Sequence, residues 1–128
     1  MGNTYEDGLR AEEMAASYLS GKQYEILEKR FRCRQGEIDL IALDHQLSLP
    51  VLVFVEVKYR HDLSFGRPSL AVTPEKMRRL IYTAEYYRSQ KRIDEMKMRF
   101  DIIEIWWAGD HHKIHHYQNA FGEDLWTN

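Results

Sequence analysis

The sequence is poor in the residues that crosslink or interrupt a small domain. Of its 128 residues only one is cysteine, Cys33, and only three are proline and seven glycine. A single thiol excludes an internal disulfide, which fits a reducing compartment. With 44% hydrophobic residues, the composition excludes a low-complexity chain and supplies enough apolar material for one core. We therefore expect one domain over residues 1–128.

Long apolar runs are also missing. No stretch approaches the roughly 20 residues that a membrane helix needs. The first residues, MGNTYEDGLRAEE, contain acids where a secretory signal would be apolar. We therefore expect a cytoplasmic protein that does not span a membrane.

A charge excess of one sign is missing too, because the formal net charge is only −2. A strongly electrostatic nucleic-acid binder would carry a large positive excess. The charges are nevertheless segregated: residues 29–34 contain four cations and no acid, and residues 75–92 contain six cations and two acids. Such segregation permits a basic face on a nearly neutral molecule, although an ordinary solvated surface gives the same pattern.

Hydrophobic periodicity and turn residues predict seven elements. The start of the second helix is the clearest boundary, because Thr73 is a capping residue followed by Pro74 and Glu75 in the first turn. The order α-β-β-β-α-β-β predicts an α/β fold with a mixed central β-sheet flanked by helices. The expected elements are a helix over residues 6–20, strands over 24–33, 37–44 and 51–58, a loop over 59–72, a helix over 73–92, a strand over 98–107 and a short strand over 113–118.

Two of these strands bring acids together. Between its terminal acids, Glu37 and Asp44, the strand over residues 37–44 is apolar on both faces except at Asp39. In the next strand Glu56 and Lys58 share a face, because side chains alternate with period two. A hairpin centred on residues 47 and 48 would set Asp39 opposite Glu56. A slip of one residue would separate them.

Two carboxylates so close repel each other, and burying them unpaired costs several kcal/mol each. A hard divalent cation, Mg²⁺ or Mn²⁺, held by Asp39, Glu56 and the carbonyl of Val57 would compensate. Lys58 could then activate water or stabilise charge at phosphorus, so the pattern predicts phosphodiester hydrolysis. An E-x-K pair on a strand is also common as a surface ion pair worth about 0–1 kcal/mol, and this alternative stays open.

Several strings together carry a family resemblance. GLRAEEMAASYL, RQGEIDLIAL, FVEVKYR, FGRPSLAVTPEKMRRL, RFDIIEI and HHYQNAF resemble, in order and over nearly the whole chain, the YraN family of small bacterial proteins. That family resembles Holliday-junction resolvases and other PD-(D/E)xK nucleases. The resemblance implies a restriction-endonuclease-like fold and a metal-dependent endonuclease. It further implies DNA as the substrate, with branched or repair-related DNA as one candidate, and a homodimer by analogy only.

The resemblance also assigns residues. Asp39, Glu56 and Lys58 match the motif acids and lysine, and Glu12 matches the glutamate of a G-x-x-A-E pattern in the first helix. The catalytic set it implies is therefore Glu12, Asp39, Glu56 and Lys58. One departure is Arg30, which stands where the family usually has Asn.

Six basic residues are candidates for nucleic-acid contact. Lys76 and Arg79 match the family's K-x-x-R at a helix start, where the helix dipole favours phosphate. A solvated helix face explains the same pair. The full set is Arg32, Arg34, Arg60, Arg67, Lys76 and Arg79.

Two further features leave the function open. The four histidines within residues 111–116 suggest zinc, but His115 should point away from its neighbours on a strand, so a compact site is not predicted. Trp106 and Trp107 should point to opposite faces, one in the core and one semi-exposed. Because a fold does not fix function, the alternative is a non-catalytic module that binds nucleic acid or a protein partner.

Overall fold

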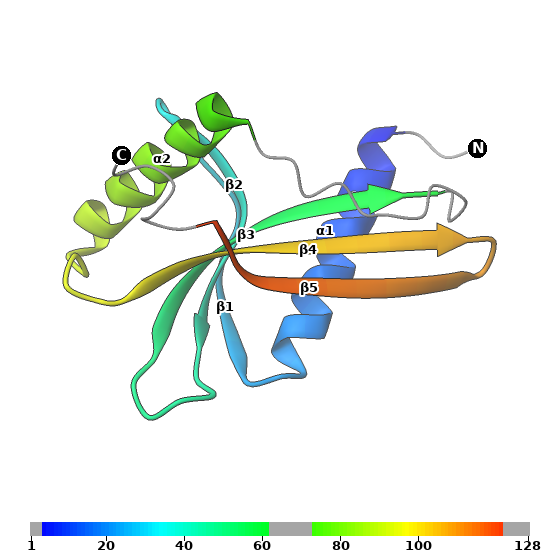
Figure 1. The fold of residues 1–128 in the computed structure, drawn as a ribbon, viewed down its shortest axis with the longest axis horizontal. Helices are drawn as coiled ribbons and strands as arrows, with labels where there is room; N and C mark the ends of the chain where they lie inside the picture. Colours follow the sequence, from blue (N-terminus) through cyan, green and yellow to red (C-terminus); the bar gives the residue numbers. More distant parts are fainter. Residues whose placement is uncertain (1–3, 62–72, 122–128) are drawn as a thin grey trace.

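The computed structural model describes residues 4–61 and 73–121 (Figure 1). None of the helices in these ranges is both long and apolar enough to cross a bilayer. The elements are α1 (Thr4–Ser20), β1 (Tyr24–Cys33), β2 (Gly36–Asp44), β3 (Val51–Arg60), α2 (Pro74–Lys91), β4 (Met98–Ala108) and β5 (His111–Phe121). This order confirms the predicted α-β-β-β-α-β-β arrangement of a restriction-endonuclease-like fold.

The five strands form one mixed sheet. They lie side by side in chain order, β1-β2-β3-β4-β5. Only β3 and β4 run parallel, whereas the other neighbours are antiparallel. Parallel neighbours need a crossover connection, and α2 lies within it.

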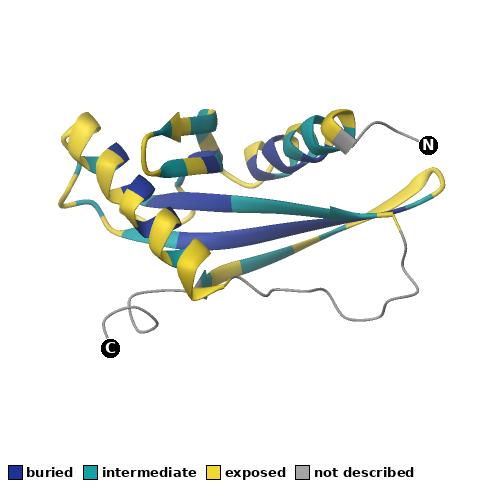
Figure 2. Cartoon of the chain, turned by 90° about the horizontal axis from the view of Figure 1, so that it is seen from above, coloured by how far each residue is buried: buried dark blue, intermediate teal, exposed yellow. Residues whose placement is uncertain are grey.

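The two helices cover opposite faces of the sheet, with their buried sides toward it (Figure 2). On the α1 face, Leu19 packs with Leu40 and other buried strand residues. On the α2 face, Leu80 packs with Ile41 and Phe54. The central strands β2 and β3 are therefore buried on both sides, which is why their sequences are apolar almost throughout.

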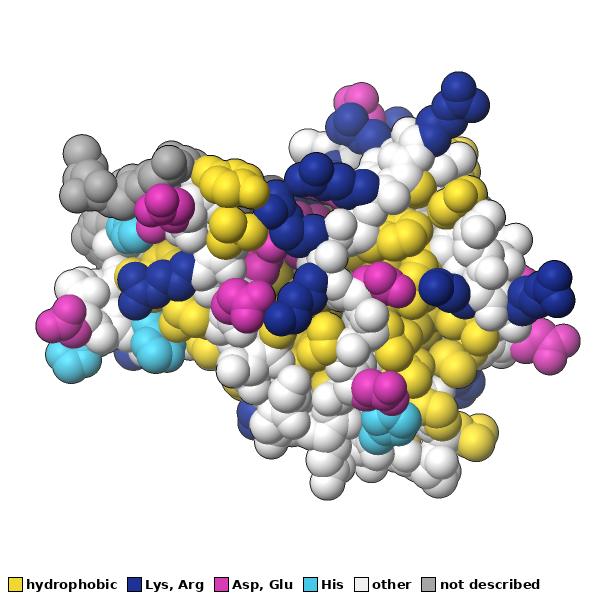
Figure 3. Space-filling model, turned by 180° about the vertical axis from the view of Figure 1, so that it is seen from behind, with side chains coloured by type: hydrophobic (Ala, Val, Ile, Leu, Met, Phe, Trp, Pro, Cys, Tyr) yellow, Lys and Arg dark blue, Asp and Glu magenta, His cyan; other side chains and the backbone are white. Residues whose placement is uncertain are grey.

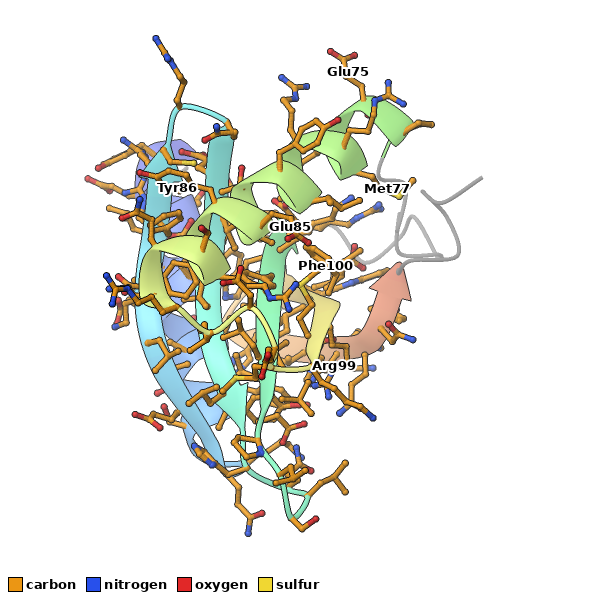
Figure 4. All side chains as sticks on the ribbon, turned by 90° about the vertical axis from the view of Figure 1, so that its left-hand side faces the viewer. Glu75, Met77, Glu85, Tyr86, Arg99 and Phe100 are labelled. Carbon is orange, nitrogen blue, oxygen red and sulfur yellow. The ribbon has the colours of Figure 1, made fainter. Side chains whose placement is uncertain are left out.

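The boundaries of α2 follow the local signals. The hydroxyl of Thr73 accepts the N–H of Lys76 at 3.1 Å, which caps the helix start. The helix ends at Arg92, whose φ of 58° is left-handed. Figure 4 shows Glu75 pointing away from the sheet at the beginning of α2, whereas Phe100 on β4 lies beneath the helix.

Three details differ from the sequence-based expectation. Strand β3 continues through Tyr59 and Arg60, and β5 is longer than predicted, because β4 offers pairing partners along its whole length. The prediction of one semi-exposed tryptophan was wrong: Trp106 is 6% and Trp107 5% exposed. A guanidinium covers each ring, that of Arg60 at 5.7 Å from Trp106 and that of Arg10 at 5.2 Å from Trp107.

A buried polar network ties β2, β4 and β5 together on the α1 face. Arg99 donates two hydrogen bonds to Asp101, at 2.8 and 2.9 Å, and a third to Asp44 at 3.0 Å. Asp101 is fully buried, and its carboxylate also lies 2.7 Å from Nε2 of His116. Because its members are multiply bonded, this network locks the relative positions of three strands.

We predict that Asp101→Asn lowers the free energy of unfolding at pH 7 by about 3–5 kcal/mol, the usual cost of breaking a buried ion pair from one side. Burial raises the pKa of Asp101, but hydrogen bonds from His116, Arg99 and the Asn119 N–H outweigh burial and lower it. The stabilisation is therefore present above the unfolded-state pKa of about 3.9 and is lost as the pH falls below it. Urea unfolding at several pH values tests this, and an equal loss at pH 7 and pH 3 would contradict it.

Candidate active site at the fork between β2 and β3

Strands β2 and β3 separate at the position of the predicted acids. The pairing runs from Asp44–Val51 to Leu40–Val55, which is the register that the sequence predicted. Beyond Leu40, β2 is paired only with β1, and beyond Val55, β3 is paired only with β4. We call this opening, visible in Figure 1, the fork.

Asp39 is held inside the fork by the backbone of β3. Its carboxylate accepts the N–H of Val57 at 2.8 Å, so a side chain replaces the strand partner that this amide would otherwise have. Burial, then the charge of Glu56 and a hydrogen bond between the two side chains, raise the pKa of Asp39, and Glu12 adds to the effect. The Val57 N–H opposes the rise without cancelling it. Three carboxylates from different elements thus influence one another here.

Helix α1 brings Glu12 to the fork from the other layer. The Glu12 side chain is 16% exposed and lies 3.5 Å from Nε of Arg30. Burial raises the pKa of Glu12, and Arg30 partly opposes this. Arg30 itself has a positive φ of 55°. Asn tolerates that conformation better than most residues, so the Asn that the resemblance led us to expect here would suit this backbone.

Lys58 lies two residues after Glu56 on β3, on the same face of the strand. Burial, then the nearby charge of Lys76, lower the pKa of Lys58, while Glu56 and Glu104 act in the opposite direction. From the start of α2, Nζ of Lys76 reaches to 3.3 Å from Oε1 of Glu56. The predicted set of Glu12, Asp39, Glu56 and Lys58 is therefore brought to one region, and a second lysine joins it.

Sequence reasoning missed Glu104. It stands opposite Lys58 in the parallel β3–β4 pair and is fully buried. One carboxylate oxygen accepts the indole N–H of Trp106, and the other lies 3.6 Å from Nε of Arg60 and has no hydrogen-bond partner among the described residues. A lone acid in the apolar run IIEIWW, residues 102–107, was the available signal, the same signal that identified Asp39.

The other predicted basic contacts are distributed around the site. Arg32 pairs with Glu37 at 2.9 Å on the β1–β2 hairpin, and Arg34 is exposed at its turn. Arg79 lies 3.8 Å from Glu75 on α2. The predicted contact at position 67 lies outside the described residues. Figure 3 shows basic and acidic side chains gathered together across the upper middle of the face seen from behind.

The donors at the fork suit a hard cation. Within residues 4–61 and 73–121, no group of three or more His, Cys, Asp or Glu side chains is arranged to hold a metal ion. The predicted ligands, Asp39, Glu56 and the Val57 carbonyl, comprise only two such side chains. The observation that fits a divalent cation is the burial of the Asp39 carboxyl beside a second carboxylate, which together make the Asp39 charge unfavourable without a counter-ion.

An open groove of about 850 Å³ lies elsewhere, between the turn after β2 and the segment after α2. Its lining includes the exposed Leu47 and Leu49 and none of the fork residues. The concentration of interacting charges, rather than the size of a cavity, therefore singles out the fork.

Fold and site together define an α/β protein with a restriction-endonuclease-like arrangement and a cluster of acids and lysines where its sheet opens. The chain belongs to the uncharacterised protein family UPF0102, whose model matches residues 11–105, and this confirms the YraN resemblance. The matched segment contains the four predicted catalytic residues and Glu104.

Similar proteins come from several bacteria, and all three described here are named only as UPF0102 proteins. The one from Pelobacter propionicus is 44% identical over 89% of this chain and 81% of its own length. The one from Geobacter sulfurreducens is 42% identical over 89% and 87%. The one from Caldanaerobacter subterraneus is 43% identical over 89% and 93%. Their names state no activity.

We predict that Asp39→Asn stabilises the metal-free protein. The pKa of Asp39 is higher in the folded than in the unfolded chain, so its charge destabilises the fold increasingly as the pH rises above about 4. The amide of Asn can still accept the Val57 N–H. At pH 8 we expect the Tm to rise by several degrees, at about 3–5 °C per kcal/mol of repulsion removed.

The matched control is Asp44→Asn. Burial raises the pKa of Asp44, but hydrogen bonds from the Gln46 N–H and from Arg99 outweigh it and lower the pKa. Asp44→Asn should therefore reduce the Tm of the protein. Thermal melts in EDTA at pH 4.5 and pH 8 decide the matter, and a lower Tm for Asp39→Asn at pH 8 would refute the crowding argument.

Proposed function

We propose that this protein is a divalent-metal-dependent nuclease that hydrolyses phosphodiester bonds in DNA. The observation that carries the proposal is the partly buried Asp39 carboxyl, which lies against Glu56 and has a raised pKa, beside a lysine whose pKa is lowered. Perturbed titratable groups of opposite type at one opening in a sheet are typical of catalytic sites.

Three groups would hold the cation: the carboxylates of Asp39 and Glu56 and the carbonyl of Val57. When bound, Mg²⁺ or Mn²⁺ supplies a Lewis acid for a phosphate oxygen and lowers the pKa of a bound water. The hydrogen bond from the Val57 N–H fixes one ligand against the backbone that provides another. This bond supports the proposal, because a ligand held by the backbone needs little rearrangement to bind an ion.

Lys58 and Glu12 would transfer protons and stabilise charge during the reaction. A lowered pKa lets Lys58 give up a proton more readily than an exposed lysine, so its amine can orient or deprotonate the attacking water. In its charged form the same group can stabilise negative charge on phosphorus. Glu12, whose pKa is raised by burial, is placed to assist ion positioning or proton transfer.

DNA is the proposed substrate because cations surround the acids although the net charge is only −2. Lys76 and Arg60 lie at the site itself, and Arg32 and Arg34 lie on the neighbouring hairpin. Phosphate contacts of this kind hold a backbone without reading its sequence. The resemblance to junction resolvases makes branched or repair-related DNA the first substrates to test.

One observation favours the alternative of a non-catalytic binding module. Two of the acids already face protein cations, Glu56 facing Lys76 at 3.3 Å and Glu12 facing Arg30 at 3.5 Å. A fork neutralised by its own side chains could bind nucleic acid and have no need of a metal. The two functions differ in their need for a metal ion: the nuclease requires the ion for cleavage, whereas the binding module does not require it to bind nucleic acid.

We predict cleavage of at least one of linear, nicked, flapped or four-way-junction DNA by the purified protein with Mg²⁺ or Mn²⁺. Asp39→Ala and Lys58→Met should each reduce the rate by about 10²–10⁴-fold, the usual contribution of a positioned catalytic group. Lys58→Met should retain metal binding, whereas Glu56→Gln should lose it. Cleavage is followed on gels and metal binding by calorimetry.

The matched control is Lys97→Met, which removes an exposed lysine far from the fork in the chain. It should leave the cleavage rate unchanged. A wild-type protein that binds no divalent ion and cuts none of the four substrates would end the nuclease proposal. DNA binding that survives in Asp39→Ala, Glu56→Gln and Lys58→Met would then support the binding module.

We further predict that Lys76→Gln tightens Mg²⁺ binding and weakens DNA binding. The ammonium of Lys76 competes with a metal ion for Glu56, and a half-exposed ion pair of this kind is worth up to about 1 kcal/mol, or a two- to fivefold change in Kd. Arg79→Gln is the control, since Arg79 pairs with Glu75 instead. If calorimetry shows that Lys76→Gln binds Mg²⁺ no more tightly than Arg79→Gln does, Lys76 does not compete with the metal ion for Glu56.

A further inference from the structure

The sheet face that carries Lys58 continues across β4 to β5. Residues on the same face follow strict rows, because the register of β3, β4 and β5 is fixed by their pairing. Helix α2 packs over β2 and over the beginning of β4, whereas β4 and β5 extend well beyond it (Figure 1). The rows are Glu56–Ile102–Tyr117, Lys58–Glu104–His115 and Arg60–Trp106–Lys113.

Aromatic rings line this extension. The rings of His115 and Tyr117 are stacked, with centroids 6.3 Å apart and an interplanar angle of 17°. The ring of Trp106 lies 5.9 Å from that of His115 and is itself covered by Arg60. Trp106 is buried and supports the others, whereas Lys113 and His115 are exposed and Tyr117 is partly exposed.

The histidine cluster of the sequence therefore divides between two faces. His116 turns inward, with its Nε2 beside Asp101 and its Nδ1 3.4 Å from the hydroxyl of Tyr18. His115 faces the other way, toward Trp106. His115 therefore points away from His116, as the alternation of side chains on a strand predicts, and is available for a different use.

Exposed aromatic rings beside cations suit the flat faces and charged backbone of unpaired nucleotides. Bases stack on such rings whatever their identity, and Lys113 supplies a contact for phosphate. Paired bases inside a duplex hide their faces and cannot use this surface. His115 on β5 is two strands away from Lys58 on β3, and neighbouring strands lie about 4.8 Å apart, so the two backbone positions are about 10 Å apart. Nucleotides next to a phosphate at the fork can span that distance.

We propose that Lys113, His115 and Tyr117 form a stacking site for one or two unpaired nucleotides of a DNA strand that leads to Lys58. This inference rests on the proposed function and specifies its substrate class, DNA with unpaired nucleotides beside the scissile bond. The surface is continuous with the fork through the Lys58–Glu104–His115 row, and its exposed cation complements the charge of the strand.

The test measures binding in EDTA, where no metal-dependent cleavage occurs. Fluorescence anisotropy compares a labelled 12-nucleotide single strand with the same sequence as a blunt duplex. Tyr117→Ala and His115→Ala should each weaken binding of the single strand about fivefold or more, the lower end of the range for one stacked base. Tyr117→Phe keeps the ring and should stay within about twofold of wild type.

The matched control is His112→Ala, an exposed histidine on the opposite face of the same strand. His112→Ala should change neither the single-strand nor the duplex affinity. In every variant the duplex affinity should stay within about twofold of wild type. Unchanged single-strand affinity in both alanine variants would overturn the proposal. So would an equal loss on single strand and duplex, because that would indicate a general electrostatic or folding effect.

Failure of this inference and failure of the nuclease proposal are distinguishable. A protein that cuts none of the test substrates but loses single-strand affinity in Tyr117→Ala keeps the stacking site and loses the nuclease. A protein that cuts DNA, and whose alanine variants bind single strands as wild type does, keeps the nuclease and loses the stacking site.

Discussion

The hydrogen bond from the Val57 N–H to the Asp39 carboxylate governs the architecture of the site. It lies where the pairing of β2 with β3 ends, and it satisfies a partly buried amide that has no backbone partner on β2. Because Asp39 is bonded to Val57, the side chain of the preceding residue, Glu56, lies against it. Glu12 approaches the same carboxylate from α1. The opening of the sheet and the crowding of its acids thus have one structural cause.

Two aspartates of the sheet show that neighbouring groups, and not burial alone, set the pKa of a carboxyl. Burial raises the pKa of both, yet the pKa of Asp101 ends below its usual value and that of Asp39 above it. Asp101 is bonded to Arg99, His116 and a backbone N–H, whereas Asp39 has one N–H and negatively charged neighbours. The first is suited to holding strands together, and the second to receiving a cation from outside.

Local signals made part of this predictable. The Asp39–Glu56 approach follows from two apolar strands joined by a short turn, and the start of α2 follows from Thr73 and its successors. The Glu104–Arg60 pair was not predictable, because it requires β4 to lie parallel to β3 after a long crossover, which no sequence period reveals. Bound metal, DNA contact and dimerisation remain predictions.

The positive φ of Arg30 has a consequence for how β2 is held in the sheet. In β1, Lys29 pairs with Leu40 and Phe31 with Ile38, but the pair between them, Arg30 opposite Asp39, is missing from the ladder. Pairing with β3 has ended at the same residue. Asp39 therefore lacks a ladder partner on either neighbouring strand, so the hydrogen bond between its carboxylate and the Val57 N–H, rather than the ladder, ties this residue to β3.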